Sequence, residues 1–427
     1  MHEFELFLSF YTYAEVSNHR CMSLPEPSHT SGSEGLRQGS TDYRRAVVAS
    51  LAAGLATFNA LYCTQAILPR LVTSFDVSPT TAALTISATT GALAICIVPA
   101  SILSERFGRG RVLVISALLA TTLGLCLPLA SSVWVIIVLR ALQGVFIAGV
   151  PAVAMTWLSE EIHPEDLAKA MGIYIAGNTV GGLSGRLIPA LFLEITTWRW
   201  ALFVTTLCAF TMAITMAVML PKQRRFQPRT LSIKNESSAM LAHWTTPSLA
   251  LLFATAFIGL GVSVSVYNYI GFRMIHTFRL SEALVGIVFL MYLAGTWSSA
   301  RAGAWTGHIG RGQGMMYGAL AMLLGLILML WESLALTLIG LFVFTAAFFL
   351  IHSIASGWVG LIATSHRAAG ASMYLLSYYV GSSVVGWMSG YAFDSLSWLG
   401  FIGWLSLWTL ALLGIAVALR RFAASTR

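Results

Sequence analysis

Twelve long apolar runs alternate with short polar segments along most of the chain. Each run reaches the roughly 20 residues that a helix needs to cross about 30 Å of hydrocarbon. Membrane-spanning strands would instead be about ten residues long, with alternating hydrophobicity. The pattern therefore predicts an all-α membrane protein with twelve transmembrane helices. The runs lie near residues 46–69, 80–104, 112–130, 133–156, 168–193, 200–220, 247–272, 282–306, 313–331, 334–357, 368–391 and 398–419.

A polar segment in the middle of the chain separates six runs from six. The sequence predicts a disordered leader (1–44), a six-helix bundle (45–220), a linker (221–246), a second six-helix bundle (247–420) and a tail (421–427). The leader is rich in Ser, Gly, Glu and Pro, a composition that cannot bury a core. Met22 begins a more typical leader than Met1, so we hold a start at Met22 as a hypothesis that N-terminal sequencing would test.

Composition and charge agree with a membrane location. The chain is 57% hydrophobic and 10% charged, and its mean hydropathy is +0.77, whereas a soluble domain carries roughly 25% charged residues. About 19 Lys and Arg residues lie in one alternate set of loops and termini and about four in the other, an asymmetry that marks the cytoplasmic side. We therefore expect both termini and the linker in the cytoplasm and the helices in a bacterial inner membrane.

The net charge of +8 does not indicate a nucleic-acid-binding protein, because the basic residues lie in short loops between apolar runs. The five cysteines lack metal-ligand spacing. We expect no metal and no cofactor. A membrane-embedded enzyme would need nucleophiles, metal ligands or carboxylates that converge within the spans, and the sequence shows none. A sensor or scaffold would usually carry a large domain outside the membrane.

The two halves are related in sequence. Residues 101–111 (SILSERFGRGR) and 303–313 (GAWTGHIGRGQ) share a G-R-G core at an offset of about 202. Such self-similarity predicts duplication of a six-helix unit, with the substrate site between the halves near the midplane. Three further pairs recur at an offset of 200: Tyr174 with Tyr374, Gly181 with Gly381, and Trp198 with Trp398.

Three segments resemble motifs of the major facilitator superfamily. Residues 101–111 resemble motif A, with Glu105 in place of its Asp. Residues 140–144 (RALQG) are similar to the core of motif B, and residues 177–182 (GNTVGG) resemble the antiporter motif C, with Asn178 where that motif has Pro. Together with FNALYCTQAILP, LSEEIHP and LSYYVGSSVVG, they resemble the YnfM-type group of bacterial inner-membrane transporters in the drug-efflux branch.

This resemblance covers residues 45–420. It implies a monomeric secondary transporter with alternating access that exports a small metabolite or drug in exchange for protons. Its partners would be a small-molecule substrate, the lipid bilayer and protons as the coupling ion, with no nucleic acid. The alternative is an uptake symporter or facilitator for a small neutral or anionic solute.

Arg140 and His352 are the candidate coupling residues. Arg140 lies about 9 Å inside the end of its predicted span, where an arginine costs at least 2.5–3.5 kcal/mol on insertion scales. The resemblance implies a role in coupling, whereas the alternative is that Arg140 caps carbonyl groups and clamps neighbouring helices. His352 could accept a proton or could be a hydrogen-bonded packing residue. No Asp or Glu falls clearly inside a span, which favours neutral, zwitterionic or anionic solutes.

Polar and aromatic residues of several spans are predicted to line the cavity between the halves. Residues 59, 62 and 65 recur every three positions and therefore share a helix face. Tyrosines near helix ends can instead be interface anchors, and Arg273 lies near the outer boundary, as a residue of the mouth. The candidate cavity residues are Asn59, Tyr62, Gln65, Gln143, Asn178, Tyr267, Asn268, Tyr374 and Tyr378.

Two further groups could control the transport cycle. The motif A group is Glu105, Arg106, Gly108 and Arg109, with Gly310 and Arg311 in the second half. The resemblance implies that its acidic residue holds the outward-open state through the eleventh span, whereas the alternative is that these charges only set topology. Gly177, Gly181 and Gly182 could form a sealing or hinge face, or could simply let helices approach closely.

Overall fold

The computed structural model describes residues 35–226, 238, 240–363 and 367–425; the hypothesis of a start at Met22 concerns residues outside this part. The first half contains α2 (Thr41–Tyr62), α3 (Leu68–Phe75), α4 (Pro79–Phe107), α5 (Arg109–Cys126), α6 (Val133–Ile147), α7 (Pro151–Glu161), α8 (Pro164–Leu193) and α9 (Trp198–Met219). The second half contains α11 (Pro247–His276), α12 (Glu282–Val288), α13 (Tyr292–Ile309), α14 (Arg311–Leu328), α15 (Leu334–Ile362), α16 (Arg367–Ser395) and α17 (Trp398–Ser425).

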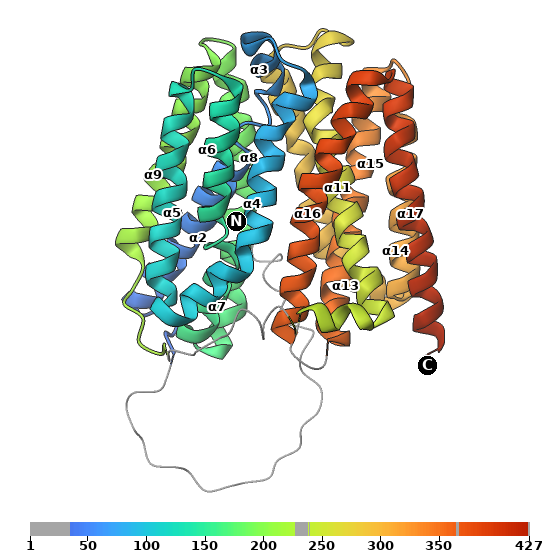
Figure 1. The fold of residues 1–427 in the computed structure, drawn as a ribbon. Helices are drawn as coiled ribbons and strands as arrows, with labels where there is room; N and C mark the ends of the chain where they lie inside the picture. The colour runs from blue at the N-terminus through green and yellow to red at the C-terminus, as the bar shows by residue number, and fades with distance from the viewer. Residues whose placement is uncertain (1–34, 227–237, 239, 364–366, 426–427) are drawn as a thin grey trace, which may run out of the picture.

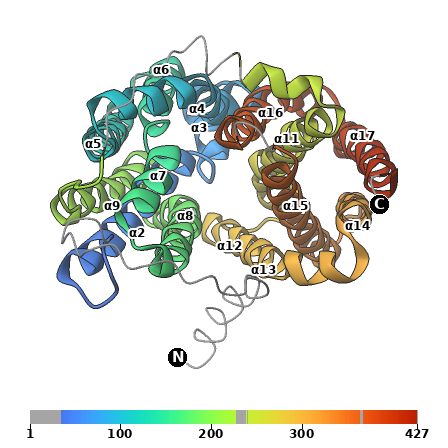
Figure 2. The ribbon, with the colours of Figure 1, turned by 90° about the horizontal axis from the view of Figure 1, so that it is seen from below.

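The helices form two bundles that stand side by side (Figure 1). The bundles meet along two seams, in which α4 packs on α16 and α8 packs on α12 (Figure 2). We call the side where α9 ends and α11 begins the linker side, and the opposite side, which carries α3, the α3 side. The predicted all-α fold of two six-helix bundles is confirmed. Most observed helices begin within a few residues of the predicted spans, but α2 ends at Tyr62 and not at residue 69, and two helices replace the fourth predicted span.

Nine helices of the described residues are long and apolar enough to cross a membrane. The three remaining predicted spans fall below that criterion for visible reasons. The fourth span is divided into α6 and α7, while α8 and α16 are long but more polar than the others. These two polar helices lie at the seams between the bundles, where a helix needs less apolar surface than it does against lipid.

Two spans are interrupted where backbone groups need other partners. The first span breaks at residues 63–67, between α2 and α3, and the fourth breaks before Pro151, the first residue of α7. Proline disfavours the helical conformation of the residue before it and lacks an N–H donor. Because broken helices leave carbonyl groups without intrahelical partners, side chains must satisfy them inside the bundle.

The backbone supports the duplication of the two halves. Gly108 and Gly310, 202 residues apart, both have positive φ (97° and 81°) at the turn between two helices. Only glycine adopts such angles without strain. Ser78 and Ser281, 203 residues apart, both accept a hydrogen bond from the third residue after them and so cap α4 and α12. Equivalent positions therefore have equivalent local structure.

The ends of the first half are more ordered than the sequence predicted. Residues 35–44 were assigned to a disordered leader, but Leu36 donates its N–H to the carbonyl of Glu161 (2.7 Å), and α2 already begins at Thr41. The Glu161 carboxylate accepts the N–H groups of Arg224 and Arg225 (3.0 and 2.9 Å). The start of the linker is thus fixed to the first half by hydrogen bonds that hydropathy does not reveal.

Candidate functional site

The two halves are joined on the α3 side. Arg70 of α3 forms an ion pair with Glu282 of α12. At mid-depth, Ser383 donates its hydroxyl to the carbonyl of Ser87 (2.7 Å). The hydrogen bonds and ion pairs that join two described residues of opposite halves lie on the α3 side or at this depth, whereas Phe107, at the linker end of α4, is 53% exposed. The molecule is therefore closed on the α3 side.

Two acidic residues make equivalent contacts in this closure. Glu194, at the end of α8, accepts the N–H of Ala283 (2.9 Å) in the first turn of α12. Asp394, 200 residues later, accepts the N–H of Thr80 (3.3 Å) in the first turn of α4. Each carboxylate lies at the positive end of a helix dipole of the other half. The Ala283 N–H, with the Ser281 hydroxyl, lowers the pKa of Glu194, which lies outside the spans.

A polar group that we call the central cluster lies between the halves. The Gln65 amide donates its Nε2 to Oδ1 of Asn268 (2.6 Å). Arg186 of α8 donates its Nε to Oε1 of Gln65 (2.6 Å) and its Nη1 to the Gly182 carbonyl (2.7 Å). The cluster comprises Tyr62, Gln65 and Arg186 of the first half with Tyr267, Asn268 and Tyr292 of the second. Four of these six were predicted as cavity residues.

Aromatic rings surround the Arg186 guanidinium. Its central carbon lies 3.8 Å from the ring centroid of Tyr62 and 4.3 Å from that of Tyr292. Its Nη2 also donates to the hydroxyl of Tyr292 (3.2 Å). Cation–π contacts at desolvated sites contribute about 2 kcal/mol or more, which offsets part of the cost of burying this charge.

Arg186 is the principal site residue that the sequence reasoning missed. Arg186 lies within the predicted span 168–193, but no role was predicted for it. The duplication could have indicated the centre of the site. Gln65 and Asn268 are 203 residues apart and therefore occupy equivalent positions of the two halves. The residue equivalent to Arg186 in the second half is Gly386, so the cluster has one cation and no counterpart.

Arg140 lies entirely inside the first bundle. It donates Nε to the Thr85 carbonyl (2.9 Å), Nη1 to the Ala60 carbonyl (2.6 Å) and Nη2 to the Leu61 carbonyl. Ala60 and Leu61 belong to the last turn of α2, whose carbonyls lose their intrahelical partners at the break in the first span. The arrangement is the carbonyl clamp that the sequence left open as an alternative to a coupling role.

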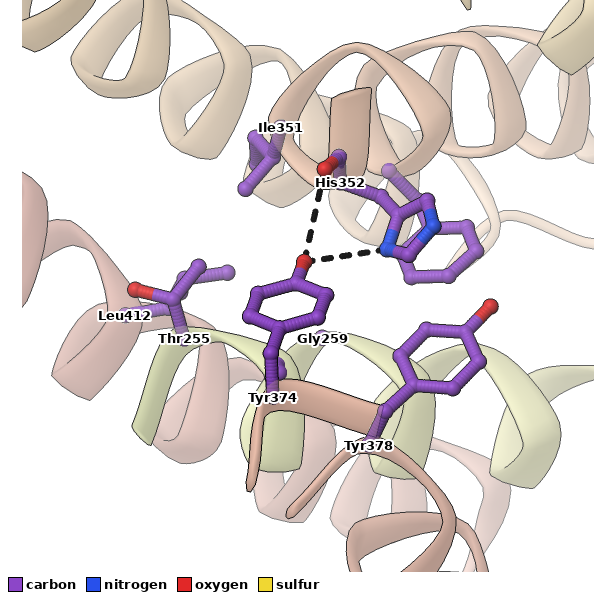
Figure 3. A pocket seen from close by; sticks show the side chains of 9 residues that line it. Thr255, Gly259, Ile351, His352, Tyr374, Tyr378 and Leu412 are labelled. Atoms are coloured by element: carbon purple, nitrogen blue, oxygen red, sulfur yellow. Dashed lines mark hydrogen bonds between the residues drawn. The ribbon is translucent and has the colours of Figure 1, made fainter. Parts of the chain in front are cut away.

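His352 lies with Tyr374 and Tyr378 in a narrow pocket of the second half (Figure 3). The Tyr374 hydroxyl is 3.0 Å from Nδ1 of His352 and 3.3 Å from its carbonyl oxygen. The ring centroids of His352 and Tyr378 are 4.7 Å apart. Phe349 packs on Phe348 of this pocket (ring centroids 5.0 Å apart) and also on Tyr292 (5.9 Å), so the histidine pocket adjoins the central cluster.

Three predicted cavity residues lie away from the central cluster. Gln143 accepts from Arg140 (2.6 Å) and donates to the α5 backbone (2.9 Å), inside the first bundle. Asn59 donates to the Ser184 hydroxyl between α2 and α8 (3.0 Å). Asn178 packs against Gly54 of α2. These amides support packing of the first half, because the spans that carry them turn these positions toward neighbouring helices.

The two copies of motif A differ. In the first, Glu105 and Arg109 form an ion pair (2.6 Å), and Arg109 also pairs with Glu160 of α7 (2.7 Å), while Arg106 is exposed. In the second, Gly310 keeps the turn and Arg311 is exposed. In this form, which is closed on the α3 side, Glu105 therefore pairs with Arg109 of its own half.

The glycines of the antiporter motif bring α8 against α2. A Cβ atom at Gly177 would lie 2.6 Å from the Leu51 carbonyl oxygen, and one at Gly181 would lie 2.7 Å from that of Leu55. At Gly182 the nearest atom would be an Arg186 nitrogen, at 3.3 Å. Gly381, the equivalent of Gly181, packs in the same way against α11. Close approach of helices is thus a property of both halves.

Two duplicated helical bundles with a buried polar cluster between them define a polytopic membrane transporter. Residues 50–295 match the sequence profile of the Major Facilitator Superfamily. Inner membrane transport protein YnfM of Escherichia coli is 40% identical over 387 residues, which are 90% of this chain and 93% of that protein. The chain belongs to the Major Facilitator Superfamily.

Other proteins are similar in sequence or in fold. The uncharacterized MFS-type transporter YybF of Bacillus subtilis is 33% identical over 90% of this chain and 96% of its own length. Among solved structures, a bacterial homolog of the human lysosomal transporter Spinster in an inward-facing conformation superposes with a TM-score of 0.71, at 13% identity, over 90% of this chain and 97% of its own. A mutant of the nucleoside transporter NupG gives a TM-score of 0.72, at 13% identity, over 89% of this chain and 100% of its own. At these identities the structures establish the fold alone.

Proposed function

We propose that the protein is a monomeric secondary transporter of the bacterial inner membrane, with its linker side in the cytoplasm, that exports a small metabolite or drug by alternating access in exchange for protons. The observation that carries the proposal is the closure of two duplicated bundles on one side only, over a buried polar cluster. The relation to an inner membrane transport protein supports the location, and the distribution of Lys and Arg supports the orientation.

Alternating access is tested without knowing the substrate. Spin labels at Thr73 and Leu284 report the α3 side, and labels at Phe107 and Ile309 report the linker side, each pair in a background without native cysteines. Pulsed electron-spin distances in nanodiscs should give two populations on each side, with one pair lengthening as the other shortens. Distances that stay fixed, or that change in the same direction, would contradict the proposal.

In this proposal His352 accepts the coupling proton, while Arg140 affects coupling only by holding the first bundle together. The direction of solute flux follows from the pH gradient. Liposomes with an internal pH dye and purified protein should show an internal pH change when a solute found by thermal-shift screening is added. His352→Gln should reduce this pH change. Solute counterflow that is independent of pH would instead favour the second candidate, a facilitator or uptake symporter. The central cluster contains no carboxylate, and this observation supports the second candidate.

A further inference from the structure

The centre of the interface holds a chain of hydrogen bonds with a defined direction. Gln65 and Asn268 occupy equivalent positions of the two halves and contact each other, so their contact lies on the axis that relates the halves. Arg186 extends the chain from one side only. A guanidinium can donate but cannot accept, and this fixes the orientation of both amides.

The direction leaves a donor unused. Since Oε1 of Gln65 accepts from Arg186, Nε2 of Gln65 must donate, and Oδ1 of Asn268 must accept. Nδ2 of Asn268 is then the free end of the chain. It is buried without a hydrogen-bond partner among the described residues, in a side chain that is 1% exposed. Buried donors are rarely left unpaired, so this position calls for an acceptor.

The cluster also holds a positive charge that no described carboxylate balances. The partners of Arg186 are an amide oxygen, a backbone carbonyl and a phenol hydroxyl. The Tyr292 hydroxyl accepts from Arg186, and the Ser263 side chain also lies within hydrogen-bonding reach of it. The rings of Tyr62 and Tyr292 flank the guanidinium and offer apolar faces. A cation, one unused donor and two aromatic faces thus converge from both halves.

We propose that the central cluster binds the carboxylate of a small organic anion whose apolar or aromatic body packs against Tyr62 and Tyr292. This inference rests on the proposed function, since the anion would be the transported solute. When the halves separate on the α3 side, the Gln65–Asn268 and Arg186–Tyr292 contacts break, because each joins one half to the other. The released donors face the opening, and a carboxylate replaces the contacts that they lose.

The test compares the binding of a carboxylate with the binding of the corresponding uncharged amide. Purified protein is titrated with benzoate and with benzamide, and with phenylacetate and phenylacetamide, and its thermal unfolding is followed. The carboxylates should raise the melting temperature of the wild type more than the amides do. Arg186→Gln should weaken benzoate binding by about 10- to 100-fold, the range expected for a hydrogen bond to a charged group.

Two variants of Asn268 keep the test decisive if Arg186→Gln fails to fold. Asn268→Leu should weaken benzoate binding, and Asn268→Asp should abolish it, because a carboxylate there would pair with Arg186. Arg273→Gln is the matched control. Arg273 is also a buried arginine of the α3 side, but it donates to the Trp331 carbonyl (3.1 Å) and packs on Trp398, away from the cluster. It should keep the preference for the carboxylate.

The inference is wrong if neither carboxylate stabilises the wild type more than its amide, or if Arg186→Gln and Asn268→Asp bind benzoate like the wild type. Its failure can be told from failure of the proposed function. Transport of an uncharged solute that is unaffected in Arg186→Gln would leave the transporter standing without the anion site. Benzoate binding that depends on Arg186, in a protein whose spin-label distances never change, would leave the site standing without alternating access.

Discussion

Arg140 and Arg186 are both buried arginines of the first half, but they differ in what surrounds them. All the carbonyl groups that Arg140 binds belong to its own bundle, so its contacts need not change when the bundles move. Arg186 contacts Tyr292 of the other half and, through Gln65, Asn268. A charge within one rigid body stabilises that body, whereas a charge between two bodies responds to their relative position.

We expect Arg140→Gln to lower the free energy of unfolding by about 2–5 kcal/mol, because the Ala60 and Leu61 carbonyls would lose their donors inside the bundle. Thermal unfolding in detergent measures this loss, and Arg140→Lys, with one donor group instead of three, should be intermediate. A variant that melts like the wild type would contradict the clamp. An Arg140→Ala protein that inserts normally and transports fully would end the coupling role.

At the scale of the element, α8 combines three tasks along one helix. Its glycines set the close contact with α2, Arg186 enters the central cluster, and Glu194 at its end reaches α12. These tasks explain why α8 is more polar than a helix that faces lipid on most sides. Glu194 lies about two turns from Arg186 along the chain, with Pro189 between them.

The glycine contact predicts a contrast within α8. Gly181→Ala should destabilise the protein by about 1–3 kcal/mol, since the added methyl group would lie 2.7 Å from the Leu55 carbonyl oxygen. Gly172→Ala is the matched control, because a Cβ there meets nothing within 4 Å. It should be neutral or stabilising, as alanine is the better helix former. Equal melting temperatures of the two variants would refute the packing role.

The sequence predicted the elements well and their contacts only in part. The number of spans and most of their bounds followed from the length of each apolar run, but the breaks within the first and fourth spans did not. Tyr62, Gln65, Tyr267 and Asn268 were predicted as cavity residues because they are polar or aromatic within spans, and they lie in the central cluster. Gln143 was assigned to the cavity from its residue type, but which helix face meets a neighbour depends on packing between segments distant in sequence. Arg186 had no assigned role for the same reason, since Tyr292 reaches it from the other half.

At the scale of the whole molecule, the closure on the α3 side has the same symmetry as the duplication. Glu194 and Asp394 each bind the first turn of a helix in the opposite half, Glu194 at α12 and Asp394 at α4. Each half therefore contributes one carboxylate and one helix end to the closure. Opening on this side requires that both carboxylates leave their helix ends, so the closed form is stabilised from both seams at once.

This closure predicts a dependence on pH. The pKa of Glu194 is lowered by the N–H of Ala283 in the closed form and returns to its ordinary value when the contact breaks. The contact therefore favours closure fully above the ordinary carboxyl pKa of about 4.3, and this contribution is lost as the pH falls through the lowered pKa. The Thr73–Leu284 spin-label distance should lengthen as the α3 side is acidified below about pH 4.3.

Glu194→Gln should lengthen the same distance at neutral pH and reduce its further change with acid. Glu332→Gln is the control, since Glu332 also lies on the α3 side and makes no contact with the other half among the described residues. A wild-type distance that shortens in acid would contradict the assignment of Glu194.

The linker is held at both ends, and this bears on how far the halves can separate. Glu161 holds Arg224 and Arg225 against the first half, while Met240 is buried and His243 lies beside Gly370 of the second. About 13 residues remain between the two attachments, and a chain of that length can reach roughly 45 Å when extended. Such a reach places little restraint on the distance between the two bundles. The relative position of the halves is therefore set by the contacts between their helices and not by the chain that joins them.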